Sequence, residues 1–238
     1  MRPSWETGFC QRQCDAMFPE FWSGLIGAWC PSLGQQDQLR DVSGHQRHGT
    51  INSATWTKAV VANQLTDVLT FAGAEDVTLD RTTSDLNNWF LGSMSAFASF
   101  SVGAVGPQYI VGSVHPTNDP FFIRVRQDTP AFISNIETDS GSVFATTNIA
   151  FSLNTWYSFG FVYDGAYMWN YRDGICINPS GDAQTGTINT FGGLYIGRET
   201  TNFYTGSIGN VYLWDRPLPH NLWKQLHEDP EAPLRLKD

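Results

Sequence analysis

Charged residues are scarce in this chain: Asp, Glu, Lys and Arg make up 16% of its 238 residues. The 14 Lys and Arg residues form no cluster, so the sequence lacks the basic footprint that binds nucleic acid phosphates. The formal net charge of −9 argues against attachment to an anionic membrane surface. Such an acidic chain is compatible with solubility, with Ca²⁺ binding or with a basic protein partner.

Long apolar runs are also lacking. No stretch approaches the ~18 uncharged apolar residues that indicate a membrane-spanning helix, so we expect no membrane segment. Residues 1–24 do not combine a charged head, an unbroken apolar run and a small-residue cleavage site, so we predict no secretory signal.

Cysteine occurs at only four positions, Cys10, Cys14, Cys30 and Cys176. Four oxidised cysteines would allow three pairings, but a chain made without a signal folds in reducing conditions, which favour free buried thiols. Cys10 and Cys14 are four residues apart and form a candidate metal pair if they lie on a helix. No second Cys or His pair stands nearby at ligand spacing to complete such a site.

What the chain does contain is typical of an all-β protein. Aromatic residues make up 14% and hydrophobic residues 41%, while Ser, Thr, Asn and Gly are frequent. This is the composition of many short strands joined by polar turns, not of a helical bundle. A chain of this length can bury a sizeable core as one β-sandwich without disulfide support.

The clearest local pattern is a three-stranded antiparallel meander over Trp156–Ile177. Its first strand places four aromatic side chains on one face: Tyr157, Phe159, Phe161 and Tyr163. Asp164-Gly165 and Asp173-Gly174 predict tight hairpin turns on either side of a return strand over Ala166–Tyr171. Further strands are expected at Ala96–Val102, Phe121–Arg126, Leu194–Ile196 and Ile208–Trp214.

Short helices are expected at both ends. Near the C-terminus, Leu222, Trp223 and Leu226 form an apolar stripe that follows Pro219 and stops at Asp229-Pro230. Residues 1–22 form an arm in which Cys10, Cys14, Met17, Phe18 and Phe21 recur at helical spacing until Pro19 ends the helix. We favour an arm packed on its own domain. The alternative is an arm that docks on another protein through Trp5, Phe9, Phe18 and Phe21.

Four segments, in this order, resemble the laminin G-like, concanavalin A-like jelly-roll family, particularly its pentraxin-related branch. They are Gly24–Trp29 followed by Asp41-Val-Ser-Gly-His-Gln-Arg-His-Gly-Thr50; Leu69–Leu79; Leu153-Asn-Thr-Trp156 with Val162-Tyr-Asp-Gly165; and Leu194-Tyr-Ile-Gly-Arg198 with Phe203–Trp214. The resemblance implies an antiparallel two-sheet jelly-roll sandwich over residues 23–229, with an arm at 1–22 and a tail at 230–238. Pro19–Gly34 and His227-Glu-Asp-Pro230 also resemble stand-alone members encoded near tailed-phage virion genes.

In relatives, the Asp-x-Ser-Gly loop and an acidic residue in a late strand bind Ca²⁺. Asp41 and Ser43 match that loop, whereas His45 replaces the usual Asn and Asn210 replaces the acidic residue. Imidazole is a poor Ca²⁺ ligand, and lost negative charge weakens affinity. The resemblance therefore implies a weakened Ca²⁺ site at these four residues. In the alternative interpretation, Asp41 and Asn210 only hydrogen-bond the loop to the closing strand.

Catalytic patterns are missing, although some relatives with this fold are glycoside hydrolases. Retaining glycosidases need two carboxyl groups about 5–5.5 Å apart, and the family's Glu-x-Asp-x-(x)-Glu strand does not occur here. No Gly-x-Ser-x-Gly motif or phosphate-binding glycine loop is present either. We therefore expect no enzyme, with a glycoside hydrolase as the remote alternative.

Sugar binding requires exposed aromatic rings flanked by polar groups. Tyr167, Trp169 and Tyr171 share one side of their strand, with Met168 on the other. Core packing is the favoured explanation of this stripe, and a glycan platform is the alternative. Tyr204, in a turn between strands, is a second candidate for an exposed contact.

Two classes of function remain open. The favoured one is a non-catalytic phage virion component, a capsid decoration or tail-associated protein. It would be held on a lattice of other virion proteins or copies of itself and would adhere to surface glycans. The other is a Ca²⁺-dependent, lectin-like carbohydrate-binding protein of a bacterium. The missing signal favours the virion, because virion proteins leave the cell by lysis.

Overall fold

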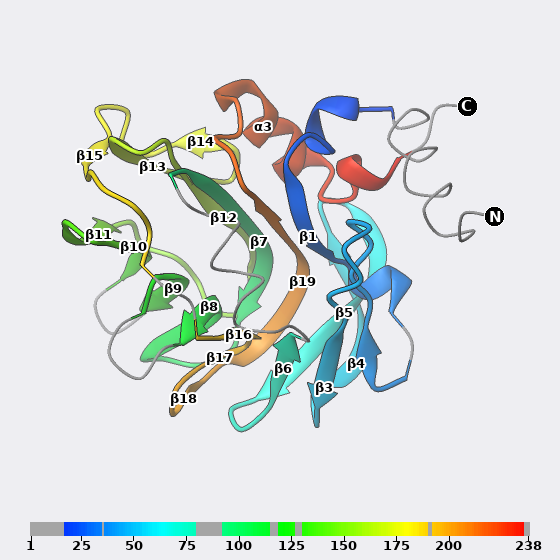
Figure 1. Ribbon diagram of the computed structural model, residues 1–238. Helices are drawn as coiled ribbons and strands as arrows, with labels where there is room; N and C mark the ends of the chain where they lie inside the picture. Colours follow the sequence, from blue (N-terminus) through cyan, green and yellow to red (C-terminus); the bar gives the residue numbers. More distant parts are fainter. Residues whose placement is uncertain are drawn as a thin grey trace.

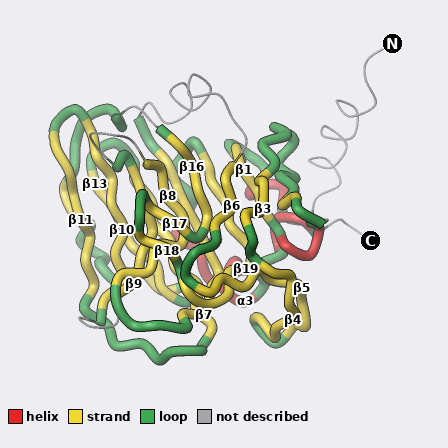
Figure 2. Tube along the Cα trace, turned by 90° about the horizontal axis from the view of Figure 1, so that it is seen from below, coloured by secondary structure: helices red, strands yellow, loops and turns green. Residues whose placement is uncertain are grey.

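The computed structural model describes residues 17–34, 36–79, 92–114, 119–126, 130–189 and 192–235. Within them, two antiparallel sheets pack face to face (Figure 1). Strands make up most of the trace, and the helical segments are few and short (Figure 2). The predicted two-sheet jelly-roll sandwich is confirmed.

One sheet has nine strands among the described residues. They are β1 (Leu25–Trp29), β4 (Thr55–Val61), β5 (Gln64–Ala72), β7 (Met94–Val102), β12 (Trp156–Tyr163), β13 (Tyr167–Arg172), β14 (Ile175–Cys176), β15 (Asp182–Ala183) and β19 (Thr205–Trp214). Their order is β14-β13-β12-β7-β19-β5-β4, with β1 paired to β19 and β15 paired to β13.

The facing sheet has eight strands among the described residues. They are β2 (Gln38–Leu39), β3 (Gly49–Asn52), β6 (Asp76–Leu79), β8 (Pro107–Val114), β9 (Phe121–Arg126), β10 (Ala131–Thr138), β11 (Gly141–Thr147) and β16 (Gly193–Ile196). Their order is β11-β10-β9-β8-β16-β6-β3-β2. A separate hairpin joins β17 (Arg198–Glu199) to β18 (Asn202–Phe203).

The main core lies between the two sheets, where alternating apolar residues of both meet. The predicted meander is confirmed as β12, β13 and β14, and β12 turns its aromatic face toward this core. Asp173 and Gly174 form the second turn with φ of +50° and +77°, as a two-residue hairpin loop requires. In β9, Phe121, Ile123 and Val125 point inward, as their alternation predicts.

A second apolar cluster covers the outer face of the nine-stranded sheet. The predicted C-terminal helix is confirmed as α3 (His220–Glu228), which buries Leu222, Trp223 and Leu226 against that sheet. The Trp223 ring stacks on Tyr171 with centroids 4.4 Å apart and planes 8° apart. Gly160 makes room for it, since a Cβ there would lie 2.5 Å from Trp223 Cζ3. None of the helices in the described residues is long and apolar enough to cross a membrane.

Both ends of the described part of the chain pack onto the sandwich through short 3₁₀ helices. These are η1 (Pro19–Phe21) and η3 (Ala232–Leu234), while η2 (Pro31–Leu33) follows β1. The N–H of Met17 donates to the Arg235 carbonyl at 2.8 Å, so the start of the described chain meets its end. Residues 230–235 are therefore part of the packed body, because Ala232 is completely buried in the outer cluster.

The docking role predicted for Phe21 is wrong. Phe21 is 0% exposed, and its carbonyl accepts the Trp214 indole N–H at 2.7 Å. Phe18 is partly buried and packs edge-on against Phe21, which leaves it little surface for a partner. Pro19 begins a helical turn instead of ending one, because its fixed φ and missing N–H suit a first turn.

Four residues of the predicted arm, Trp5, Phe9, Cys10 and Cys14, lie outside the described residues. The free-thiol prediction is confirmed for Cys30 and Cys176. Cys30 is buried and donates to the Tyr212 hydroxyl at 3.3 Å. Burial raises the pKa of this thiol far above its usual range, so it is unreactive at neutral pH.

Candidate functional site

The predicted calcium loop begins at Asp41, whose carboxylate is occupied by backbone N–H groups. Oδ1 accepts from Ala28 at 3.0 Å and from Ser43 at 2.9 Å, and Oδ2 accepts from Arg47 at 3.0 Å. Asp41 is 5% exposed and also forms an isolated bridge to Trp29 in β1. These contacts favour the alternative interpretation, in which Asp41 fastens the loop to the sheet.

The other predicted calcium ligands, Ser43, His45 and Asn210, interact with different groups. The Ser43 hydroxyl accepts the His45 N–H at 3.4 Å, while burial and the nearby Arg47 lower the pKa of the His45 imidazole. The Asn210 amide donates to the Pro230 carbonyl at 2.8 Å. Among the described residues, no three His, Cys, Asp or Glu side chains gather as a metal site. These contacts do not fit one shared site, so we favour the interpretation without Ca²⁺, and the EDTA measurement below tests it.

Asp41→Ala is expected to lower the free energy of unfolding by about 2–4 kcal/mol, because it leaves buried N–H groups without an acceptor. Urea unfolding measures the loss. Asp37→Ala, at an exposed position nearby, serves as the control and should change stability by less than about 0.5 kcal/mol. Excess EDTA should leave the wild-type unfolding midpoint unchanged. A drop with EDTA comparable to that of Asp41→Ala would mean that the carboxylate binds a metal ion.

The aromatic stripe on β13 lies on the outer face of the nine-stranded sheet, and Met168, which lies on the other side of the strand as predicted, packs in the main core. Tyr171 is only 2% exposed because Trp223 covers it, and its hydroxyl hydrogen-bonds His220 Nδ1. The glycan role predicted for Tyr171 is therefore wrong, and the core-packing interpretation holds there. Trp169 is partly buried, whereas Tyr167 is 44% exposed.

Tyr167 and Trp169 form what we call the aromatic shelf. Their ring centroids are 5.7 Å apart. Strand β15 borders them, since Tyr167 pairs with Ala183. Asp182 lies in the same short strand and accepts the Asn178 amide at 2.7 Å. The shelf thus offers accessible aromatic surface beside the short edge strand β15.

Tyr204 is not an exposed contact, contrary to prediction. It is 0% exposed, and its hydroxyl donates to the Ser101 carbonyl at 2.8 Å. Its ring meets Phe71 edge-on, with centroids 5.9 Å apart. The residue falls between two strands, but its side chain enters the main core, where burial raises the pKa of the phenol well above its usual range.

Strand β19 changes its partner halfway along. Thr205–Ile208 pair with β5, whereas Val211–Trp214 pair with β1. On the other side of the strand, a bulge between Ile208 and Val211 breaks the pairing with β7. Gly209-Asn210 therefore lie at a fork in the sheet, and the Asn210 N–H donates to the Ser99 hydroxyl at 2.9 Å. Bulges of this kind re-aim side chains and are common next to binding sites.

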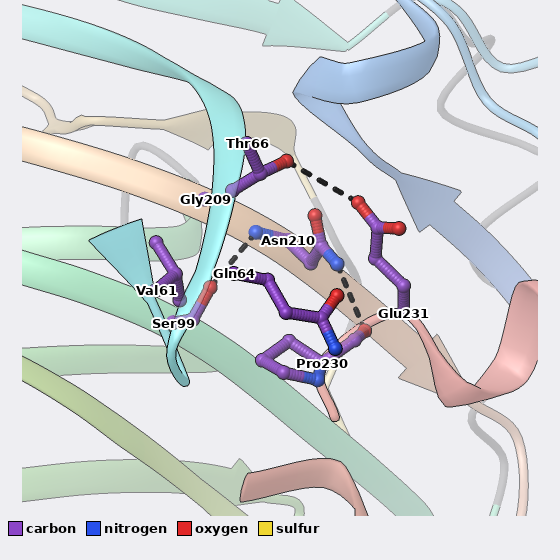
Figure 3. Close-up of a pocket in the computed structure, with 8 residues that line it drawn as sticks. All are labelled: Val61, Gln64, Thr66, Ser99, Gly209, Asn210, Pro230 and Glu231. Atoms are coloured by element: carbon purple, nitrogen blue, oxygen red, sulfur yellow. Dashed lines mark hydrogen bonds between the residues drawn. The ribbon is translucent and has the colours of Figure 1, made fainter. Parts of the chain in front are cut away.

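A shallow groove with a free volume of about 10 Å³ opens over this fork, and we call it the fork groove (Figure 3). Its lining comprises Val61, Gln64, Thr66, Ser99, Gly209, Asn210, Pro230 and Glu231. Figure 3 shows the Asn210 side chain between those of Gln64 and Glu231. A hollow with a free volume of about 50 Å³ adjoins it, shares Val61, Ser99 and Pro230, and adds Trp156 and His227.

Ser158 and His227 line the adjoining hollow, and Asp173 lies beside His227, but the three residues do not form a catalytic relay. Ser158 Oγ lies 3.0 Å from His227 Nδ1, and Asp173 Oδ1 lies 3.8 Å from the same nitrogen. A serine nucleophile needs its base on one ring nitrogen and the orienting carboxylate on the other. Here the His227 imidazole links the end of α3 to β12 and to the turn between β13 and β14.

Three carboxylates meet beside the eight-stranded sheet, namely Asp119, Glu137 and Glu199. The Asp119 N–H donates to Glu137 Oε2 at 3.2 Å. Burial, followed by the charge of Glu199 and a hydrogen bond to it, raises the pKa of Asp119 to about 6. Two carboxyl groups that hydrogen-bond each other are closer than the about 5–5.5 Å of a retaining glycosidase.

Sequence comparison decides the family. A model described as the concanavalin A-like lectin/glucanases superfamily matches residues 71–221. The chain belongs to this family. None of the curated proteins matches its sequence.

Solved structures similar to this concanavalin A-like chain include a sialidase, an arabinanase domain and a toxin domain. Trypanosoma rangeli sialidase in complex with 2,3-difluorosialic acid has a TM-score of 0.68 and 13% identity, covering 97% of this chain and 39% of that one. Domain 4 of AbnA, a GH43 extracellular arabinanase from Geobacillus stearothermophilus in complex with arabinotriose, has a TM-score of 0.66 and 13% identity, covering 86% and 98%. The binding domain of botulinum neurotoxin DC in complex with rat synaptotagmin II has a TM-score of 0.62 and 13% identity, covering 86% and 51%.

At these identities the likeness shows the concanavalin A-like fold alone. The chain spans between 33% and 39% of the length of the sialidases it resembles. Among the similar structures are some that bind carbohydrate and one that binds a protein.

Sequence reasoning missed the fork groove in this concanavalin A-like sandwich. Its lining comes from β4, β5, β7, β19 and the C-terminal segment, which no local pattern joins. One signal was available, because Gly209 interrupts the predicted strand Ile208–Trp214. A glycine inside a strand often marks a bulge.

Proposed function

We propose that the protein is a non-catalytic carbohydrate-binding module that holds a glycan on the aromatic shelf. The observation that carries this proposal is the exposure of Tyr167, at 44%, beside the Trp169 ring. Aromatic rings supply large apolar contact area with a polar tip, which suits a sugar ring that has apolar faces and hydroxyl edges.

The setting of the shelf supports the same role. Both rings stand on a strand held by β12 on one side and by β15 on the other, so they are rigidly placed. The similar arabinanase domain was solved with arabinotriose, which is consistent with sugar binding by this fold.

We also propose that this binding occurs without hydrolysis. Ser158 and Asp173 face the same nitrogen of His227, which is not the arrangement of a serine relay, and a hydrogen-bonded pair of Asp119 and Glu199 is closer than the two carboxyl groups of a retaining glycosidase. These arrangements argue against catalysis by the described residues.

We place the module on a phage virion, as a decoration or tail-associated protein bound to other virion proteins or to copies of itself. The support is the resemblance of Pro19–Gly34 and His227–Pro230 to phage-associated members. Capsid or tail genes beside its gene would support this setting, and an operon of carbohydrate metabolism would count against it.

Tyr167→Ala and Trp169→Ala are each expected to weaken glycan binding at least about tenfold, corresponding to about 1.4 kcal/mol. The measurement is binding to a glycan array, followed by calorimetry with the best glycan. Phe144→Ala removes a comparably exposed aromatic ring from the eight-stranded sheet and should leave affinity unchanged. Equal losses from all three variants, or none from the shelf variants, would contradict a site on the shelf.

A further inference from the structure

A hollow opens between the 3₁₀ helices η2 and η3, and we call it the terminal hollow. Its lining comprises Ser32, Leu33, Glu231, Leu234 and Arg235. Its free volume is about 230 Å³, whereas the fork groove, with about 10 Å³, has room for about one water molecule. The terminal hollow is therefore large enough to take a whole side chain.

Apolar side chains on the border of the terminal hollow remain uncovered. Leu33 is 44% exposed, and Leu234 is only partly buried. Met17, which is 40% exposed, adjoins them, because its N–H donates to the Arg235 carbonyl (Figure 1). Single exposed apolar residues are common on protein surfaces, but several gathered around a hollow indicate a surface that binds another segment.

The charged side chains of the lining already have partners. The Arg235 guanidinium binds the Asp229 carboxylate through two of its nitrogens and donates to Gln64 Oε1 at 3.1 Å. Glu231 accepts the Thr66 hydroxyl at 3.3 Å. The cation of the hollow is thus compensated within the chain, and the surface left over is that of the leucines. An apolar side chain fits this surface better than an anion does.

We propose that the terminal hollow binds residues 1–16 of the same chain, through the aromatic rings of Trp5 and Phe9. Residues 1–16 precede Met17 and lie outside the described residues. Trp5 and Phe9 are the aromatic residues of this stretch, and such rings supply a large apolar contact area. Binding of this kind is independent of the glycan site in the proposed function.

Met17 places the preceding segment within reach of the hollow. The Met17 N–H is held by the carbonyl of Arg235, which itself lines the hollow. Phe9 stands eight positions before Met17 and Trp5 twelve positions before it, and an extended chain spans up to about 3.3–3.6 Å per residue. Such short tethers give effective concentrations in the millimolar range, so a weak apolar contact is enough to hold the segment.

Charge favours the same chain over a second copy. In residues 1–16, Arg2 and Arg12 balance Glu6 and Asp15, so the formal net charge of −9 resides on the rest of the chain. The segment therefore approaches its own body without net repulsion, whereas two bodies of this charge repel each other. A second copy in dilute solution also has to compete with a tethered segment.

The test is an NMR experiment on the full chain with ¹³C-labelled leucine methyl groups. Nuclear Overhauser contacts are expected between the methyl groups of Leu33 or Leu234 and the ring protons of Trp5 or Phe9. These contacts should persist on dilution. In a mixed sample they should occur within each chain and not between labelled and unlabelled chains. Replacing both rings, as Trp5→Ala with Phe9→Ala, should shift the Leu33 and Leu234 methyl signals, which then lose the ring currents.

Leu33→Asp places a charge on the border of the hollow and should abolish the contacts at Leu234. Ile175→Asp is the matched control and should leave them intact. Ile175 is 68% exposed and lies in β14, whereas η2 packs beside β5, near the opposite edge of the same sheet. Far-ultraviolet circular dichroism checks that both variants are folded, as expected for substitutions at exposed positions.

Three results would overturn this assignment. In a folded wild-type chain, an absence of contacts at Leu33 and Leu234 would leave residues 1–16 free to dock on another protein. Contacts found only between labelled and unlabelled chains would assign the hollow to the segment of a second copy. Equal effects of Leu33→Asp and Ile175→Asp would show that the contacts do not arise in the hollow.

Discussion

Trp223→Ala is expected to lower the free energy of unfolding by about 3–5 kcal/mol, the range for removing a large buried aromatic side chain. Trp223 is 1% exposed and joins α3 to the nine-stranded sheet. Its ring stacks on Tyr171, and its centroid lies 6.3 Å from that of Phe97. Gly160 beneath it has no side chain that could refill the space, so the variant keeps a cavity.

Urea unfolding monitored by far-ultraviolet circular dichroism measures this loss. Lys224→Ala, in the same helix, is the control because the Lys224 side chain is 75% exposed and pairs with the exposed Glu228. It should change stability by less than about 0.5 kcal/mol. A loss below about 1 kcal/mol for Trp223→Ala would mean that α3 contributes little to the sandwich.

Gly206→Ala is expected to destabilise the chain by more than about 4 kcal/mol, a loss that single substitutions rarely reach. Gly206 has a φ of +137°, a conformation that residues with a side chain seldom adopt. A Cβ at this position would also lie 2.1 Å from the Ser101 carbonyl oxygen and 2.8 Å from the Gly103 nitrogen. These are backbone atoms of the neighbouring strand β7 and of the residue that follows it, and they cannot move aside without breaking its pairing with β19.

Gly141→Ala separates the cost of the positive φ from the cost of the steric overlap. Gly141 has a similar φ of +130°, but nothing lies within 4 Å of its Cβ position. The free energy of unfolding of this variant should therefore fall only by the cost of the backbone conformation, about 1–3 kcal/mol. Thermal and urea unfolding of both variants give the comparison, and equal losses would show that steric overlap at Gly206 adds nothing.

Local patterns predicted the parts of the fold whose causes are local. Two Asp-Gly turns and the alternation of aromatic residues define the meander over Trp156–Ile177, and all of these lie within a short stretch of sequence. The helix at His220–Glu228 followed from its apolar stripe. Such features need no knowledge of distant segments.

The incorrect predictions involve contacts between distant segments. Phe21 is buried because it packs on Trp214, 193 residues away, and a helical spacing says nothing about that partner. Tyr204 follows a turn, where exposure is the rule, yet its hydroxyl meets the Ser101 backbone in the core. Tyr171 is covered by a helix that comes much later in the chain.

In the candidate site, too, the features with local causes were predicted, and those that depend on distant segments were not. Strand alternation predicts that Tyr167 and Trp169 share one side of their strand. Which side faces outward, and whether the rings stay accessible there, depends on how the two sheets and α3 pack. The fork groove depends on β5 and β1 sharing one partner strand, which sequence alone does not reveal. Asp41 was correctly placed in a tight loop, but its carboxylate binds backbone N–H groups in that loop and in β1.

The central claim is that this concanavalin A-like sandwich binds carbohydrate without cleaving it. The most direct measurement applies the wild-type chain to a glycan array, with and without EDTA, and then analyses the bound glycans for cleavage products. We expect binding to at least one glycan class, unaffected by EDTA, with every glycan intact. A blank array, or products released from the bound glycan, would contradict the account.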